Sequence, residues 1–479
     1  MHFLLYSARL LVVLLIGCTL NGFSAMPATA AENALSLEQR VARIEQLQPP
    51  APPVINTGDN AWVLASAALV LMMTAPGLIL FYGGLVRSKN VLATMMHSLI
   101  LMALVSALWM VFGYSLAFAP GAGWSGAFVG NPLTYFMLKD VGGAPNANYA
   151  GTVPQQSFML FQMMFAIITP ALISGAMAER IKFKAYVLFV LLWVTVVYFP
   201  LCHMVWGQGG YFNWALGGRV PVLDFAGGTV VHISSGVSAL VCALVLGKRT
   251  GYPAEPMLPH NVVLSLIGTG LLWVGWFGFN AGSALNSGAL ATSAFAATHF
   301  SAAAAALSWA AAEWFHKGKP SVLGAASGMV AGLATITPAS GFVTAPAAFG
   351  IGLVAGVVCY LAVTKLKAKF GYDDSLDVFG VHGVGSTTGM LLLGFLASAA
   401  VNPAIATTFH ANGVAVSLAG GTHQFFNQAL AVVFTVVYAG AASFILLKLV
   451  NALVGLRVHA EDEDAGLDLT QHGERAYTD

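Results

Sequence analysis

Long apolar segments recur along this chain from Asn60 to Val450, and short polar stretches separate them. An α-helix needs about 20 apolar residues to cross the hydrocarbon core of a bilayer. The pattern therefore predicts an all-α integral membrane protein with eleven transmembrane helices. We place them at residues 60–86, 90–118, 156–178, 185–207, 225–247, 262–284, 289–315, 320–338, 344–366, 376–398 and 424–450.

The N-terminal segment differs from the apolar spans that follow it. Residues 1–30 combine Arg9, a brief apolar core and an Ala-Thr-Ala sequence, as a cleaved signal peptide does. The sequence LIGC, ending at Cys18, also fits a lipoprotein cleavage box, so lipid attachment there is the alternative. In both cases the mature N-terminus is expected outside.

Three further regions follow the signal peptide. Residues 31–57 are predicted to form a polar periplasmic extension, either a flexible linker or a short amphipathic helix. Residues 58–450 are predicted to form one membrane domain, and residues 451–479 a cytoplasmic tail. The acidic run 461–464 in that tail, taken by itself, is typical of a solvated linker.

Composition supports the membrane assignment and excludes other classes. Of 479 residues, 58% are hydrophobic and 8% are charged, against roughly 25% charged in an ordinary soluble domain. A formal net charge of +1 provides no field that would attract nucleic acid. The four cysteines form neither a metal-ligand pattern nor a disulfide framework, so we expect no metal and no cofactor.

Charged residues in the loops predict the orientation, because cytoplasmic loops are enriched in Lys and Arg. One set of alternate loops holds fourteen basic residues and the other set holds two, Lys139 and Arg219. An odd number of spans follows, with the N-terminus out and the C-terminus in. The fourteen are Arg87, Lys89, Arg180, Lys182, Lys184, Lys248, Arg249, Lys317, Lys319, Lys365, Lys367, Lys369, Lys448 and Arg457.

A short motif occurs twice, five spans apart. Asp224 precedes His232 in the fifth span, and Asp377 precedes His382 in the tenth. Because an odd number of spans inverts the second copy, the pattern predicts two inverted five-helix repeats plus one helix, as in many transporters.

Ionisable side chains inside membrane spans are costly and are often functional. The isolated His97, His203 and His299 favour packing roles, whereas the repeat-related His232 and His382 favour a functional one. Two neutral imidazoles in contact share one proton, since one nitrogen donates and the other accepts. Such a pair can bind a small neutral amine and oppose a bare cation.

Five ordered segments resemble the ammonium transporter family, in its microbial and plant branch, and the resemblance runs from about Asn60 to the C-terminus. The family implies ammonium transport across a bacterial inner membrane and excludes an enzyme. The segments are AERIKF (178–183), DFAGGTVVH (224–232), WFGFNAGS (276–283), DVFGVHG (377–383) and GLDLTQHGERAY (466–477).

The resemblance implies a substrate site on the outer side. Phe161, Trp206 and Ser283 would bind ammonium, with Trp276 nearby in the vestibule wall. Aromatic faces attract cations by about 0.5–2 kcal/mol each, and a hydroxyl accepts an N–H. Without the resemblance, Phe161 and Trp206 would favour a role as core or interfacial aromatics over substrate binding.

Below this site the resemblance implies a closed, apolar pore. Phe165 and Phe279 would form a gate of stacked rings, and His232 and His382 would line the pore and relay protons. Asp224 matches a buried acidic residue that holds the outer site in shape. Alternatively, the Asp224 carboxylate caps a broken helix, and this role is compatible with holding the outer site in shape.

The family also implies partners: membrane lipid, two further copies in a homotrimer, and a P-II-type nitrogen regulatory protein at the segment 466–477. An ammonium sensor that signals through a cytoplasmic partner is the alternative function. An aquaporin is excluded because the chain has a single Asn-Pro-Ala triplet. The stretch 208–222 is longer than in the family's bacterial members, which leaves the shape of the outer vestibule open.

Overall fold

The computed structural model describes residues 54–409 and 413–477. The predicted signal peptide, Cys18 and residues 31–53 of the polar extension lie outside the described residues.

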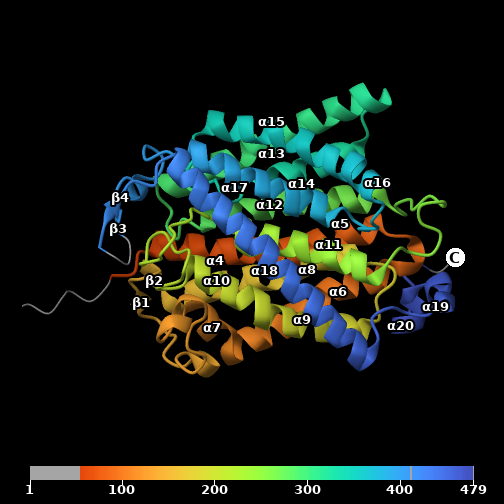
Figure 1. Cartoon of the computed structure of the whole chain (residues 1–479), viewed down its shortest axis with the longest axis horizontal. Coiled ribbons are helices and arrows are strands. Elements are labelled where there is room, and N and C mark those ends of the chain that lie inside the picture. Colours follow the sequence, from red (N-terminus) through yellow and green to blue (C-terminus); the bar gives the residue numbers. More distant parts are fainter. Residues whose placement is uncertain (1–53, 410–412, 478–479) are drawn as a thin grey trace, which may run out of the picture. The chain divides into compact units, whose positions relative to one another are not determined.

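Helices dominate the described chain and follow the predicted order of spans (Figure 1). The first half contains α4 (Thr57–Met72), α5 (Ile79–Leu85), α6 (Val91–Leu108), α7 (Tyr114–Phe118), α8 (Gln155–Met177), α9 (Phe183–Trp193), α10 (Phe199–Trp206) and α11 (Ser234–Leu246). The second half contains α12 (Val262–Gly282), α13 (Ala289–Lys317), α14 (Val322–Ile336), α15 (Ala345–Leu361), α16 (Lys367–Phe370), α17 (Val384–Leu396) and α18 (Thr422–Val454).

Ten helical stretches in the described residues are long and apolar enough to cross a membrane. The eighth predicted span is represented by α14, which has only 15 residues. At 1.5 Å per residue it is about 22 Å long, less than the roughly 30 Å of a hydrocarbon core. The all-helical architecture therefore agrees with the sequence, whereas the count of eleven crossings stays a prediction.

The described residues have two distinct ends, which Figure 1 separates clearly. The hairpin end carries two short antiparallel strand pairs, β1 (Pro145–Asn146) with β2 (Ala150–Pro154) and β3 (Thr408–Phe409) with β4 (Ala415–Val416). The tail end carries α19 (Ala460–Ala465) and α20 (Leu467–His472). The helix α18 runs obliquely across the bundle between them and packs on α11, α17 and α9.

Both repeat motifs begin with a π-helical turn, η7 (Gly228–Ile233) before α11 and η9 (Phe379–Gly383) before α17. Single π turns inside helices are frequent at functional sites. The two motifs meet closely: a Cβ on Gly236 would lie 2.3 Å from the backbone nitrogen of Gly383. Glycine thus allows α11 and η9 to approach each other, beside the contact between His232 of η7 and His382 of η9.

Candidate functional site

A cavity of about 280 Å³ opens at the hairpin end. Its wall includes the indole of Trp206, the hydroxyl of Ser283 and the ring of Phe165. The Trp206 Nε1 donates to the backbone oxygen of Asp224 at 2.9 Å, and Ser283 Oγ donates to the backbone oxygen of Phe279 at 2.8 Å. Because each hydrogen is already engaged, the Ser283 oxygen and the indole face remain available to a ligand that donates hydrogen bonds.

The segment between Trp206 and Asp224 supplies another part of this wall. Residues 213–216 line the cavity, and Asn213 holds their turn by accepting from the backbone nitrogens of Ala215 and Leu216 at 2.8 and 2.7 Å. The long stretch 208–222 therefore forms part of the cavity wall. The sequence alone did not predict where this stretch would lie.

Two aromatic residues that were predicted for the substrate site or its wall lie deeper in the bundle than expected. Phe161 is fully buried and contacts Phe165 edge-on, with 4.9 Å between ring centroids. Trp276, expected in the vestibule wall, instead stacks on His232 with a centroid distance of 5.4 Å. Its Nε1 donates to Thr337 Oγ1 at 2.9 Å, which fixes the indole beside the histidines.

Stacked phenyl rings separate the hairpin-end cavity from the histidines. The rings of Phe165 and Phe279 lie 4.1 Å apart at their centroids, with an interplanar angle of 30°. Phe165 lines the hairpin-end cavity, whereas Phe279 lines the next cavity inward. The stacked pair therefore lies between the two spaces.

The histidine cavity beyond the rings measures about 10 Å³, room for about one water-sized molecule. His232 and His382 line it, and their Nδ1 atoms lie 3.2 Å apart. Both side chains are buried, and His232 Nε2 has no hydrogen-bonding partner within the described residues. The predicted pair is thus in contact, with one ring nitrogen free to meet a small ligand.

A third cavity, of about 200 Å³, continues toward the tail end. It shares Phe81 and His382 with the histidine cavity, and its wall includes Ser327 and Asp377. Three cavities therefore follow one another along the bundle, and aromatic rings and imidazoles form the partitions between them.

Asp224 closes the turn that precedes η7. Its Oδ1 accepts from the nitrogens of Gly227 and Gly228 at 2.8 and 2.6 Å, and its Oδ2 accepts from Thr229 N and Oγ1 at 2.7 and 2.5 Å. The turn requires a left-handed residue, since Gly227 has φ +113°. The cap thereby fixes both the Trp206 acceptor and the helix that carries His232.

The structural counterpart of Asp224 is Asp374, whereas the sequence comparison paired Asp224 with Asp377. Asp374 precedes His382 by eight residues, as Asp224 precedes His232, and its Oδ2 accepts from Phe379 N at 2.8 Å. Asp377 is partly exposed and pairs with Lys367. The shared eight-residue spacing was the signal that could have identified Asp374.

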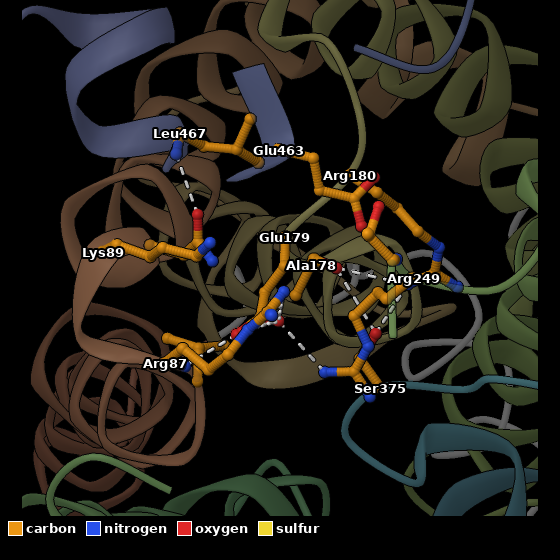
Figure 2. A network of polar contacts seen from close by, with 12 residues as sticks. Arg87, Lys89, Ala178, Glu179, Arg180, Arg249, Ser375, Glu463 and Leu467 are labelled. Carbon is orange, nitrogen blue, oxygen red and sulfur yellow. Dashed lines mark hydrogen bonds and ion pairs between the residues drawn. The ribbon is translucent and has the colours of Figure 1, made fainter. Parts of the chain in front are cut away.

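Buried ion pairs tie the tail-end loops together (Figure 2). Glu179, from the AERIKF motif, contacts Arg87 at 2.7 Å and Arg249 at 3.2 Å. Arg249 also contacts Asp373 at 2.8 Å. Burial alone would raise the pKa of the Asp373 carboxyl, but the hydrogen bonds and charge of Arg249 outweigh it, so this pKa lies below its ordinary value.

The tail docks on these loops. Glu463 of α19 is buried, accepts from Thr250 N at 2.7 Å and pairs with Arg457 at 2.7 Å. At the start of α20, Leu467 N donates to Asn90 Oδ1 at 2.8 Å, a contact visible beside Lys89 in Figure 2. The acidic run is therefore partly a set of docking contacts rather than wholly a solvated linker.

Serial cavities inside a bundle of apolar helices define a multi-pass membrane protein with a transport pathway. Residues 61–477 match the model of the Ammonium Transporter Family. An ammonium transporter of Bacillus subtilis is 48% identical over 422 residues, covering 88% of this chain and 99% of the relative. A putative ammonium transporter of Methanothermobacter thermautotrophicus is 47% identical over 424 residues, covering 88% and 99%.

Solved structures agree with the family match. Mep2 of Candida albicans superposes with a TM-score of 0.77 at 34% identity, covering 88% of this chain and 90% of that one. A sensor Amt protein superposes with a TM-score of 0.76 at 27% identity, covering 87% and 98%. The chain belongs to the ammonium transporter family.

Family membership decides several predictions. The all-helical membrane fold and the family resemblance are confirmed, and the protein is an ammonium transporter rather than an enzyme. The sensor alternative is not favoured, because the most similar relatives named above are transporters.

Proposed function

We propose that ammonium is bound in the hairpin-end cavity, loses a proton there, and crosses the pore as ammonia past the histidine pair. The observation that carries the proposal is the 3.2 Å contact between the Nδ1 atoms of His232 and His382 in a cavity too small for a hydrated ion. Trp206 and Ser283 would contact the cation, with Phe161 supporting Phe165 from behind.

Energetics favour deprotonation over transfer of the whole ion. Moving a bare cation into an apolar lumen costs tens of kcal/mol in the idealised limit. Removing a proton at pH 7 from an amine with a pKa of roughly 9–10 costs about 3–4 kcal/mol. Sodium and potassium have no proton to lose, so the same lumen rejects them.

The histidine contact also supports a proton relay. In a neutral pair one Nδ1 donates and the other accepts, so one Nε2 carries a hydrogen and the other has a free lone pair. A proton received at the free Nε2 can leave from the opposite Nε2 after the shared hydrogen shifts. A second resident proton would place two positive charges about 3 Å apart, which the poorly solvated lumen opposes.

Currents in proteoliposomes test this mechanism. We expect His232→Asp to lose ammonium conduction or gain potassium conduction, since a fixed carboxylate would hold a cation. The double variant His232→Ala, His382→Ala should lose proton-coupled current. Wild-type selectivity and wild-type current in both variants would leave the histidines as packing residues.

We further propose that the chain works as a homotrimer in the inner membrane and that residues 466–477 bind a P-II-type regulatory protein. Support comes from the family match and from the tail that docks on the tail-end loops. Pull-down at low ATP and 2-oxoglutarate should retain the cognate P-II protein. No retention, together with unchanged transport after truncation at Gly455, would contradict the regulatory role.

A further inference from the structure

Two amide side chains on α18 face the backbone segment 221–223, which leads into the hairpin-end site. Gln428 Nε2 donates to the oxygen of Leu223 at 2.7 Å, and Gln428 Oε1 accepts from Leu223 N at 2.9 Å. Gln424 Nε2 donates to the oxygen of Pro221 at 3.1 Å and to Gln428 Oε1 at 3.0 Å. Gln428 thus pairs with both polar groups of Leu223, as a neighbouring β-strand would.

This pairing is fully buried, since Gln428 has 0% of its surface exposed. A primary amide inside a membrane helix is costly unless its donors and acceptors are all engaged. Burying an apolar side chain at position 428 would cost less free energy than burying an amide. It would, however, leave the buried N–H and C=O of Leu223 without these hydrogen-bond partners. The glutamine therefore stabilises one specific backbone conformation.

That conformation determines the geometry of the site one residue further on. The backbone oxygen of Asp224 accepts the Trp206 indole N–H at 2.9 Å, while its carboxylate caps the turn that leads to His232. Gln428 fixes the Leu223 oxygen, which lies in the Leu223–Asp224 peptide, and a shift of that peptide would displace Asp224 and carry its carbonyl oxygen away from Trp206. The position of the indole in the cavity wall then depends on α18.

We propose that Gln428 is a positioning residue of the ammonium site, acting through Leu223 and Asp224 on the orientation of Trp206. The inference rests on the proposed function, because it takes Trp206 as a contact for ammonium. It assigns a role in substrate affinity to a helix that does not line the hairpin-end cavity within the described residues.

The test is the ammonium dependence of current in proteoliposomes. Gln428→Leu should raise the half-saturating ammonium concentration about three- to tenfold, the equivalent of one buried hydrogen bond. The maximal current per folded protein should change less. Ser443→Ala is the matched control, because Ser443 is a buried polar residue of α18 that bonds to Trp193 and Ser238; its half-saturation should stay at the wild-type value.

A double-mutant cycle separates positioning from general stability. Combining Gln428→Leu with Trp206→Leu should shift half-saturation no further than Trp206→Leu does. If Gln428→Leu does not fold, Gln428→Met replaces it, since the unbranched methionine side chain is close to glutamine in length and has no donor for Leu223 O.

Three results overturn the inference. Wild-type half-saturation in the Gln428 variant overturns it while leaving the ammonium site intact, provided that Trp206→Leu shifts affinity. An equal shift in the presence and absence of Trp206 shows that Gln428 does not act through the indole. Unchanged half-saturation in Trp206→Leu overturns this inference and the proposed substrate site together.

Discussion

Asp224 concentrates four hydrogen bonds on one buried carboxylate, at the start of the helix that carries His232. Removing them should leave three backbone nitrogens without an acceptor. We expect Asp224→Ala to destabilise the protein by on the order of 2–4 kcal/mol and to reduce ammonium current. Thermal unfolding of the purified protein in detergent measures the first effect, with Asp377→Asn as the partly exposed control. An unfolding temperature equal to that of the wild type would contradict the prediction.

Asp374 provides a pH-dependent prediction. Burial, only partly offset by Lys367, raises the pKa of its carboxyl from 3.8 to about 6. Because the folded state binds this proton more tightly than the unfolded state, the ionised carboxyl destabilises the fold above about pH 6, by on the order of 3 kcal/mol. Stability should be regained as the pH falls from about 6 toward 4.

Asp374→Asn tests this dependence, since an amide cannot ionise. The variant should show a flatter change in unfolding temperature between pH 7 and pH 4.5, with Glu461→Gln as the control because Glu461 is an exposed carboxylate. A wild-type slope in Asp374→Asn would assign the effect to another group.

Side-chain identity predicted some members of the site but not their depth. Phe165 contacts Phe279 and His232 contacts His382, as the family resemblance implied for all four residues, and the repeated motif by itself had paired the two histidines. Trp276 could not be placed from sequence, since its depth depends on the distant acceptor Thr337. Gln428 was missed for the same reason: its partner lies 205 residues away.

At the scale of elements, the apolar pattern located the spans but not their internal breaks. Periodicity and length predict a helix over 225–247, whereas the helix begins at Gly228 because the preceding residues form the Asp224 cap. The tail was harder to interpret. Its acidic run resembles a linker until the partners of Glu463, Thr250 and Arg457, are seen in space.

The docking of α19 yields a further prediction. Glu463→Ala should free α19 from Thr250 N and Arg457, a loss of about 1–3 kcal/mol of local stability. Hydrogen exchange of residues 457–472 should then be faster, and a protease should cleave the tail sooner. Glu461→Ala is the matched control, because Glu461 lies exposed on the same short helix. Equal protection in the two variants would show that the Glu463 contacts do not hold the tail.

At the scale of the whole molecule, the charge pattern predicts that the tail end faces the cytoplasm. Its loops carry Arg87, Arg180 and Arg249, and the contacts of these residues in the buried network show that their charge also stabilises the fold. The structure leaves one crossing to be tested by experiment, since α14 is shorter than the other spans.

Single-cysteine variants, made in a protein whose four natural cysteines are replaced, can test both the orientation of the tail end and the crossing by α14. Ala147 at the hairpin end and Glu461 at the tail end are exposed, so Ala147→Cys should react with an impermeant maleimide on intact cells and Glu461→Cys only after lysis.

Lys319 and Thr344 flank α14 and its following turn, and both are exposed. If α14 crosses the membrane, Lys319→Cys should be protected and Thr344→Cys labelled. Labelling of both from the same side would reduce the count to ten crossings, and because an even count cannot place the termini on opposite sides, it would also contradict the predicted orientation of one end.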